Sequence, residues 1–207
     1  MGLKITDYPT VLDSSTAVLD AVEYLGTKTD TPDLAQYGSI QAVIRLIVQH
    51  QCHNIVELHS PHSRLGCTLC KAFDDITITS ICNPHEPHDD HMDNLTCVQD
   101  WSSNTLETFD DESLDLVFIH DHDTPHHELS NTLHCWLRKI KPGGILCGTH
   151  FGLQCDMSEQ AGALYDFVSK ERLVLEAYTE HLFICYNKPQ SPEPKEGPIR
   201  MMPLNDD

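Results

Sequence analysis

The chain is poor in basic residues. It contains 13 Lys and Arg against 32 Asp and Glu, which gives a formal net charge of −19 at pH 7. Proteins that bind nucleic acid need a basic surface to displace the counterions of the phosphate backbone, and anionic membranes also attract basic patches. The deficit therefore argues against nucleic acid and against membranes as partners. A small or neutral substrate, or a basic protein partner, fits the charge better.

Long hydrophobic runs are also missing. No apolar stretch approaches the roughly 18 residues of a transmembrane helix, and residues 1–7 contain no apolar core of secretory length. Nine cysteines, an odd number, are scattered through the expected strands and helices, as is typical of reduced, buried thiols in a cytoplasmic protein. Cys67 and Cys70 have the spacing of a redox or metal pair, but two cysteines spaced in this way within a helix more often pack in the core.

The size and composition indicate one domain with a sizeable core. The chain has 207 residues, of which 40% are hydrophobic and 22% charged. Residues 1–50 form an expected N-terminal helical segment of two helices. The first follows N-cap residues at 13–15 and is stopped by Gly26, and the second has Ser39 as its N-cap and an apolar stripe that runs to Val48. Residues 51–188 are expected to form an α/β domain. Residues 189–207 contain five prolines and are expected to be a flexible tail.

From residue 51 onwards, short apolar runs alternate with helical patterns. Strands are expected at residues 54–58, 76–81, 95–99, 114–119, 145–149, 173–178 and 181–186. Helices are expected after the first strand through Phe73 and at residues 102–109, 125–140 and 158–170. This alternation predicts a Rossmann-like, doubly wound α/β fold with a mostly parallel seven-stranded sheet, an antiparallel edge strand and the additional N-terminal helices. Sheets of this kind bind ligands at the carboxyl ends of their central strands.

Two segments carry a resemblance to a known family. Residues 115–123 read Asp-Leu-Val-Phe-Ile-His-Asp-His-Asp, and residues 136–146 read Trp-Leu-Arg-Lys-Ile-Lys-Pro-Gly-Gly-Ile-Leu. In this order they resemble class I S-adenosylmethionine-dependent methyltransferases, most closely the small-molecule O-methyltransferase branch with an Ile-Asp-Gly-Asp-His type motif. The resemblance covers roughly residues 54–186 and implies that S-adenosylmethionine is the cofactor. Residues 141–144, Lys-Pro-Gly-Gly, are expected to form a turn before the strand at residues 145–149. Gly143 and Gly144 would permit a close-packed entry into this central strand, where a Cβ would collide.

In that family the first strand ends in an acidic residue and a Gly-x-Gly turn, against which the cofactor packs. Here Glu57 supplies the acid, but the turn that follows contains no glycine. Pro61 also removes a backbone donor from it. The resemblance implies cofactor contacts for Glu57, His59, Ser60 and Gly66, of which Gly66 matches the family's later glycine.

Three further segments fall at the remaining positions of the family's cofactor site, and the first of them departs from the family's pattern. Asn83 follows the second strand, where an acid usually grips the ribose hydroxyls, and it can bind a hydroxyl with less strength than a carboxylate. Asp100 and Trp101 follow the third strand, where the resemblance implies contacts with the exocyclic amine and the ring of adenine. Trp101 could instead simply pack. His120 ends the fourth strand at the same edge of the sheet.

Carboxylates after strands four and five hold a divalent metal ion in some members of this branch. The resemblance implies Asp121, Asp123 and His150 as metal ligands, with His120 or His122 as a further nitrogen donor. Mixed His and Asp ligation suits Zn, Mn or Fe better than Mg. His122 or His150 is the candidate catalytic base because imidazole titrates near neutral pH, and Asp121 is a further candidate catalytic residue. The alternative is that these are ordinary exposed histidines. Residues 85–91 are also rich in His and acids, but an irregular loop preorganises ligands poorly, which favours an acidic lid or surface loop.

Three functions remain open on the sequence. The leading hypothesis is S-adenosylmethionine-dependent O-methyl transfer to a small or glycosylated hydroxyl substrate. Its rival is a catalytically inactive methyltransferase-fold protein that serves as a binding or scaffold module, which the missing turn glycines favour. The third is a metal-dependent hydrolase or lyase that uses the His/Asp cluster. The N-terminal helices could cover the substrate pocket or form the contact of a homo-oligomer.

Overall fold

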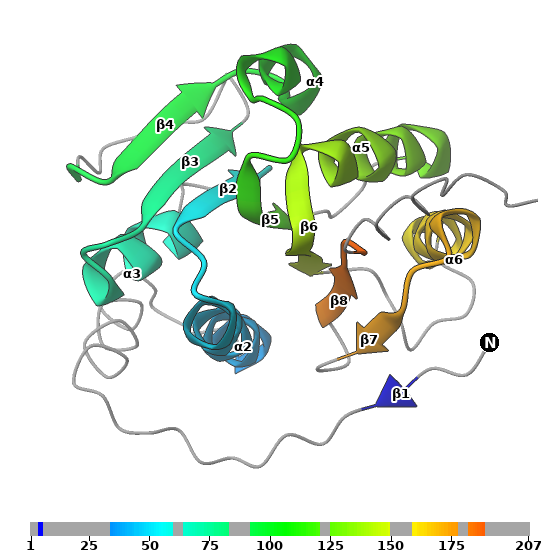
Figure 1. Ribbon diagram of the computed structural model, residues 1–207, viewed down its shortest axis with the longest axis horizontal. Coiled ribbons are helices and arrows are strands. Elements are labelled where there is room, and N and C mark those ends of the chain that lie inside the picture. Colours follow the sequence, from blue (N-terminus) through cyan, green and yellow to red (C-terminus); the bar gives the residue numbers. More distant parts are fainter. Residues whose placement is uncertain are drawn as a thin grey trace, which may run out of the picture.

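The computed structural model describes residues 4–5, 34–59, 64–82, 92–120, 125–149, 159–177 and 182–188. Three predicted features lie outside these ranges: the first of the N-terminal helices, most of the loop after the second predicted strand, and the tail. The described residues form one mixed sheet with helices on both of its faces (Figure 1).

The sheet contains β1 (Lys4–Ile5), β2 (Asn54–Leu58), β3 (Thr77–Cys82), β4 (Leu95–Gln99), β5 (Leu114–His120), β6 (Ile140–Thr149), β7 (Leu175–Ala177) and β8 (Leu182–Tyr186). Their order across the sheet is β1-β7-β8-β6-β5-β2-β3-β4. Strands β2 to β6 are parallel, and β8 is antiparallel to both β6 and β7. This arrangement confirms the predicted Rossmann-like α/β fold. The sequence does not predict β1, which pairs with β7 and adds an eighth strand.

The helices are α2 (Leu34–His50), α3 (Arg64–Ala72), α4 (Ser102–Thr105), the 3-10 turn η2 (Leu106–Thr108), α5 (His126–Lys139) and α6 (Glu159–Glu171). Two of them differ from the prediction: α2 begins before Ser39, and the helix expected at residues 102–109 is divided into α4 and η2. One core cluster packs α2 and α3 against the sheet, and a second packs α5 and α6 against the opposite face (Figure 1).

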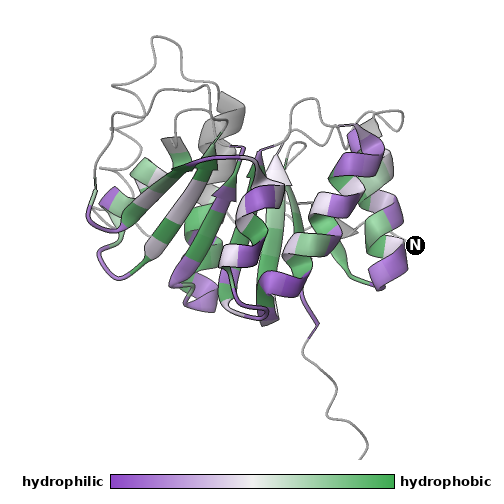
Figure 2. Cartoon of the chain, turned by 90° about the horizontal axis from the view of Figure 1, so that it is seen from above, coloured by the Kyte–Doolittle hydropathy of each residue, from purple (hydrophilic) through white to green (hydrophobic). Residues whose placement is uncertain are grey.

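Strand β5 supplies side chains to both cores. Leu116 and Phe118 belong to the cluster under α2 and α3, whereas Val117 and Ile119 belong to the cluster under α5 and α6. Successive side chains of a strand point to opposite faces, so a strand buried on both faces needs a continuous apolar run. Figure 2 shows hydrophobic strands in the middle of the molecule and hydrophilic residues on the outer sides of the helices. Among the helices of the described part, none has the length and apolar character needed to cross a membrane.

The Lys-Pro-Gly-Gly segment differs from its prediction. The sequence predicts a turn there and a strand from residue 145, but the segment already belongs to β6, whose register against β5 is irregular at this point. Gly143 has a φ of +85°, in the left-handed region that favours glycine. A Cβ on Gly144 would lie 2.6 Å from Ile140 Cγ2 and 2.8 Å from the backbone oxygen of Asp115. The predicted collision is therefore confirmed at Gly144, whereas Gly143 is needed for its conformation.

Cys67 and Cys70 are both buried in α3. Burial raises the pKa of the Cys70 thiol to about 12, which favours the protonated, less reactive form near neutral pH. Its Sγ meets the backbone oxygen of Asn94 at 3.6 Å. These contacts support the interpretation of the pair as core packing.

Candidate functional site

Half of the residues that the sequence assigns to a site lie in the described structure. They are Glu57, His59, Gly66, Asp100, Trp101 and His120. The remaining residues lie outside the described ranges, and their roles stay predictions: Ser60, Asn83, Asp121, His122, Asp123 and His150. The described residues gather at the carboxyl ends of β2, β4 and β5 and at the first turn of α3. They form a buried hydrogen-bonded cluster around Glu57 and one wall of a cavity beside His59.

Glu57 is the centre of the buried cluster, with only 1% of the residue exposed. Its Oε2 accepts hydrogen bonds from the backbone N–H of Gly66 at 3.1 Å and from the hydroxyl of Ser80 at 3.0 Å. Its Oε1 lies 3.0 Å from Nε2 of His120. A buried carboxylate is tolerated only when donors satisfy it. Because these partners come from α3, β3 and β5, the Glu57 side chain joins three elements that meet at the site.

The same carboxylate explains why residue 66 is glycine. A Cβ on Gly66 would lie 3.0 Å from Glu57 Oε2 and 3.0 Å from Leu95 Cδ1, closer than ordinary van der Waals contact. The absence of a side chain at residue 66 therefore lets the backbone of α3 approach Glu57 this closely without displacing the side chains of Glu57 and Leu95. The sequence assigns both Glu57 and Gly66 to cofactor contacts, but their described contacts are with each other and with the rest of the protein.

His59 is the first residue of the turn after β2, which the resemblance aligns with the glycine turn of the family. Its φ is +57°, a left-handed conformation that costs a residue with a Cβ roughly 1–2 kcal/mol. Its backbone N–H donates to the oxygen of Ile81 at 2.9 Å, and its Nε2 lies 3.1 Å from Oγ of Ser102. The turn therefore keeps a glycine-like backbone without glycine, and an imidazole reaches from the end of β2 to the start of α4.

A cavity of about 630 Å³ opens beside His59, lined by the connection between β4 and α4 and by the outer side of α5. Oδ1 of Asp100 accepts hydrogen bonds from the backbone N–H of Trp101 at 2.7 Å and from Nδ2 of Asn104 at 2.8 Å. Trp101 is 55% exposed, which counts against the alternative that its ring simply packs in the core. The ring is therefore accessible to a planar ligand that stacks on it.

Helix α5 contributes cavity residues that the sequence analysis does not assign to a site. Glu128, Asn131, Thr132 and Cys135 line the cavity, and their spacing of i, i+3, i+4 and i+7 places them on one side of the helix. The apolar pattern of α5 distinguishes a buried side from a polar one. It cannot distinguish a polar side that faces a cavity from one that faces bulk water, so the sequence carried no signal for these residues.

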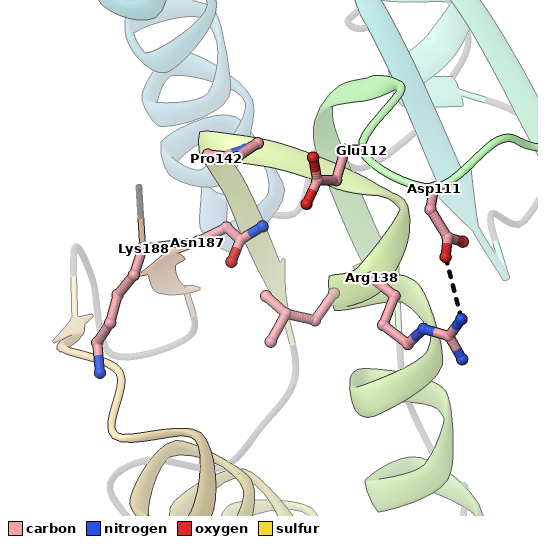
Figure 3. Close-up of a pocket in the computed structure, with 7 residues that line it drawn as sticks. Asp111, Glu112, Arg138, Pro142, Asn187 and Lys188 are labelled. Carbon is pink, nitrogen blue, oxygen red and sulfur yellow. Dashed lines mark hydrogen bonds and ion pairs between the residues drawn. The ribbon is translucent and has the colours of Figure 1, made fainter. Parts of the chain in front are cut away.

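A second hollow, of about 270 Å³, lies at the amino ends of β5 and β6 (Figure 3). Asp111 is paired there with Arg138 at 3.0 Å and with Nζ of Lys139 at 2.8 Å. Hydrogen bonds from Lys139 and Arg138 lower the pKa of Asp111. Lys139 Nζ also donates to the backbone oxygen of Phe109 at 2.9 Å. These contacts connect the end of α5 to the segment before β5. The charged residues of this hollow therefore have a structural role.

The predicted metal site has no counterpart in the part of the chain that the structure describes, where no group of three or more His, Cys, Asp and Glu could hold an ion. Its predicted ligands Asp121, Asp123 and His150 lie outside that part. The neighbouring His120 has its Nε2 directed at Glu57.

Comparison with known proteins bears on the fold and the family. No curated protein matches the chain. A Staphylococcus aureus protein assigned as a caffeoyl-CoA O-methyltransferase superposes with a TM-score of 0.61 at 12% identity, over 82% of this chain and 91% of that one. An S-adenosylhomocysteine-bound methyltransferase from Podospora anserina gives 0.57 at 14% identity, over 88% and 91%. The O-methyltransferase TomG from Streptomyces achromogenes, in complex with S-adenosylmethionine, gives 0.53 at 11% identity, over 86% and 92%.

These structures are similar in fold at low identity, and the family assignment comes from a separate comparison. The family model described as a methyltransferase domain matches residues 13–149, well over half of the 207 residues. The match includes β2 to β6 and every residue named above for the cavity and the Glu57 cluster. The chain therefore belongs to the methyltransferase domain family.

Proposed function

We propose that the chain is an S-adenosylmethionine-dependent O-methyltransferase that acts on a small or glycosylated hydroxyl substrate. The observation that carries the proposal is the cavity at the carboxyl ends of β2 and β4, where Asp100 stands beside the exposed ring of Trp101. The similar Streptomyces and Podospora proteins hold S-adenosylmethionine and S-adenosylhomocysteine, which supports the same cofactor here.

The cavity suits the adenosine portion of this cofactor. Stacking of a base on an aromatic ring contributes roughly 1–3 kcal/mol, and Trp101 offers such a ring. Both hydrogen bonds to Asp100 use Oδ1, so Oδ2 can accept a hydrogen bond from an exocyclic amine. A volume of about 630 Å³ lies within the usual range of small-molecule and cofactor pockets.

The cofactor supplies an electrophilic methyl group when it is bound. The residues of the chain must then orient the substrate hydroxyl, accept its proton and exclude water. We propose His122 or His150 as the proton acceptor and Asp121 as a further catalytic residue, because they follow β5 and β6 along the chain. Asp121, Asp123 and His150 are the proposed ligands of a divalent metal ion that would polarise the hydroxyl.

Calorimetric titration with S-adenosylmethionine and S-adenosylhomocysteine tests the central part of the proposal. We expect both to bind, and Trp101→Ala to weaken binding by about tenfold or more because the stacking ring is lost. Tyr165→Ala is the matched control, since Tyr165 is an exposed aromatic residue of α6, 41% exposed, that does not line the cavity. No heat and no thermal shift at millimolar cofactor would overturn the proposal.

Chelation tests the metal part separately. We expect treatment with EDTA to lower methyl transfer, and Zn or Mn to restore it in the wild-type protein but not in Asp121→Ala. Activity that is unchanged by chelation would remove the metal ion from the proposal and leave cofactor-dependent methyl transfer intact.

A non-catalytic binding protein is the second candidate, and His59 is the observation that favours it. Its side chain occupies a position where the family has glycine, and it is hydrogen-bonded to Ser102 on the cavity wall. His59→Gly distinguishes the two functions. If this variant binds S-adenosylhomocysteine and the wild-type protein does not, the imidazole has closed the site and the non-catalytic function is supported. Binding by both supports the enzyme.

The cysteines favour a reducing compartment, and we propose the cytoplasm. Every cysteine in the described ranges is a free thiol, and six of these eight are buried. The proposed partner is a small-molecule substrate. Self-association through the N-terminal helices is a further proposal, which light scattering at several protein concentrations tests.

A further inference from the structure

The cavity beside His59 has a second polar wall, formed by one side of α5. Four side chains of this wall line the cavity: Glu128, Asn131, Thr132 and Cys135. Because they are spaced i, i+3, i+4 and i+7, they lie on one side of the helix and span roughly 10 Å along its axis. The proposed adenine site uses only the other wall, with Asp100 and Trp101. A base stacked on Trp101 therefore has one edge toward Asp100 and another edge for which α5 supplies the partners.

Of these four side chains, that of Asn131 has both a strong donor and a strong acceptor available. The hydroxyl of Thr132 donates to the backbone oxygen of Glu128 at 3.0 Å. The carboxylate of Glu128, whose Oε1 lies 3.8 Å from Nε2 of His127, offers acceptors only, and the thiol of Cys135 is a weak partner in either sense. Asn131 is exposed, and its amide makes no hydrogen bond to any residue in the described ranges.

We propose that Asn131 is a specificity-determining residue that recognises the adenine of S-adenosylmethionine through N7 and the exocyclic amine. This inference rests on the proposed function, in which the base stacks on Trp101 and Asp100 accepts from the amine. The amine has two N–H groups, and Asp100 uses one of them. The second N–H lies beside N7, so this edge of the base presents a donor next to an acceptor. The amide of Asn131 presents the matching pair, because its oxygen accepts and its nitrogen donates.

The pairing separates the contribution of Asn131 from that of Asp100. A change at the exocyclic amine would affect both residues, since each accepts from one of its N–H groups. A C–H in place of N7 removes the acceptor that meets the amide nitrogen of Asn131 and leaves the amine intact. A base without N7 therefore tests Asn131 and keeps the contact with Asp100 unchanged.

Calorimetric titration with S-adenosylhomocysteine and its 7-deaza analogue, in which a C–H replaces N7, measures this contact. We expect the wild-type protein to bind S-adenosylhomocysteine more tightly by roughly three- to tenfold, as for a hydrogen bond between neutral groups. The preference should disappear in Asn131→Leu, which has neither donor nor acceptor. It should disappear or reverse in Asn131→Asp, which keeps an acceptor for the amine and has no donor for N7. Thr132→Val is the matched control, because it removes a neighbouring hydroxyl of the same wall and should keep the preference.

Alkylation of Cys135 locates the bound base without any substitution. Cys135 is an exposed free thiol one helical turn from Asn131. We expect saturating S-adenosylhomocysteine to slow its alkylation by iodoacetamide, followed by mass spectrometry, because a base held against Asn131 covers the neighbouring turn of the wall. An unchanged rate with the ligand bound would place the base away from α5 and overturn the proposal.

The outcomes separate this inference from the proposed function. Equal affinity of the wild-type protein for the two ligands, or a preference that persists in Asn131→Leu, would overturn the role of Asn131, while binding itself would still support cofactor use. The wild-type ratio decides the question even if a variant does not fold. If neither ligand binds the wild-type protein at millimolar concentration, the proposed function fails and the assignment of Asn131 fails with it.

Discussion

Replacement of His59 tests whether the turn at the end of β2 stores backbone strain. A φ of +57° costs a residue with a Cβ roughly 1–2 kcal/mol and costs glycine almost nothing. The hydrogen bond between the imidazole and Ser102 offsets part of this cost, by roughly 0.5–1.5 kcal/mol. Because the two contributions have opposite signs, one substitution alone cannot separate them.

A pair of substitutions separates them. His59→Ala removes the hydrogen bond and keeps the strain, so the free energy of unfolding should fall by about 1 kcal/mol. His59→Gly removes both. After allowance for the greater entropy of glycine in the unfolded chain, His59→Gly should be more stable than His59→Ala by roughly 0.5–1 kcal/mol. In ordinary helix or strand backbone a glycine variant is less stable than the alanine variant by a similar amount. The sign of the stability difference between His59→Gly and His59→Ala therefore decides the test.

Urea unfolding gives the free energy of unfolding of the three proteins. The comparison is valid if the slope of this free energy against urea concentration, the m-value, is the same for all three. Ser102→Ala is the control, because it removes the same hydrogen bond without touching the turn and should lose about as much stability as His59→Ala. If His59→Ala is as stable as His59→Gly or more so, residue 59 does not hold a left-handed backbone in solution, and the reasoning is refuted.

Three further predictions concern the entry to β6, the amino end of the sheet and the cavity. Gly144→Ala should lower the free energy of unfolding by roughly 2–3 kcal/mol, since overpacking typically costs 1–3, and Gly143→Ala by only about 1 kcal/mol; equal losses in urea unfolding would contradict this. Burial raises the pKa of Asp115, but hydrogen bonds from Lys141 and from two backbone N–H groups outweigh it, and the net pKa is lowered. Its contribution to stability is therefore present above the unfolded pKa, about 3.9, and is lost as the pH falls through the folded pKa. Asp115→Asn should accordingly destabilise the protein at neutral pH and have little effect in acid; urea unfolding at both pH values checks this, and an equal loss in acid would count against it. Trp101→Ala should leave the melting temperature nearly unchanged because the ring is 55% exposed, so a large drop would show that the ring packs.

The sequence predicts two of the strands to the residue. Strands β2 and β4 lie at residues 54–58 and 95–99, as expected, because short apolar runs bounded by polar residues leave little choice of boundary. The turn predicted at Lys-Pro-Gly-Gly is wrong because local preference takes no account of neighbouring strands. The N–H of Gly143 donates to the oxygen of Asn187, and the N–H of Asn187 donates to the oxygen of Gly144. Pairing with a distant segment, and not local preference, determines this conformation.

The partners of Glu57 are beyond the sequence for a different reason. The parallel register places Ser80 beside Glu57 on one side and Phe118 beside it on the other. A slip of one residue would turn every side chain of a strand to the opposite face. Sequence patterns identify these strands, but they do not set the register between strands that long crossovers bring together. The acid could therefore be identified from the sequence, whereas the cluster that it forms could not.

The resemblance aligns residues 59 and 66 with glycines of the family's motif, and the two positions differ in what would require a glycine. At residue 66 the requirement is space, because a Cβ would lie 3.0 Å from Oε2 of Glu57, and this holds whether or not a cofactor binds. At residue 59 the requirement is conformational, and histidine meets it with a φ of +57° at a cost that its hydrogen bond to Ser102 partly offsets. The glycine at 66 is therefore no argument that cofactor binding is kept, and the histidine at 59 is no argument that the turn is destroyed. The effect of the imidazole on the cavity is a difference in affinity, which titration of the wild-type protein and of His59→Gly with S-adenosylhomocysteine measures.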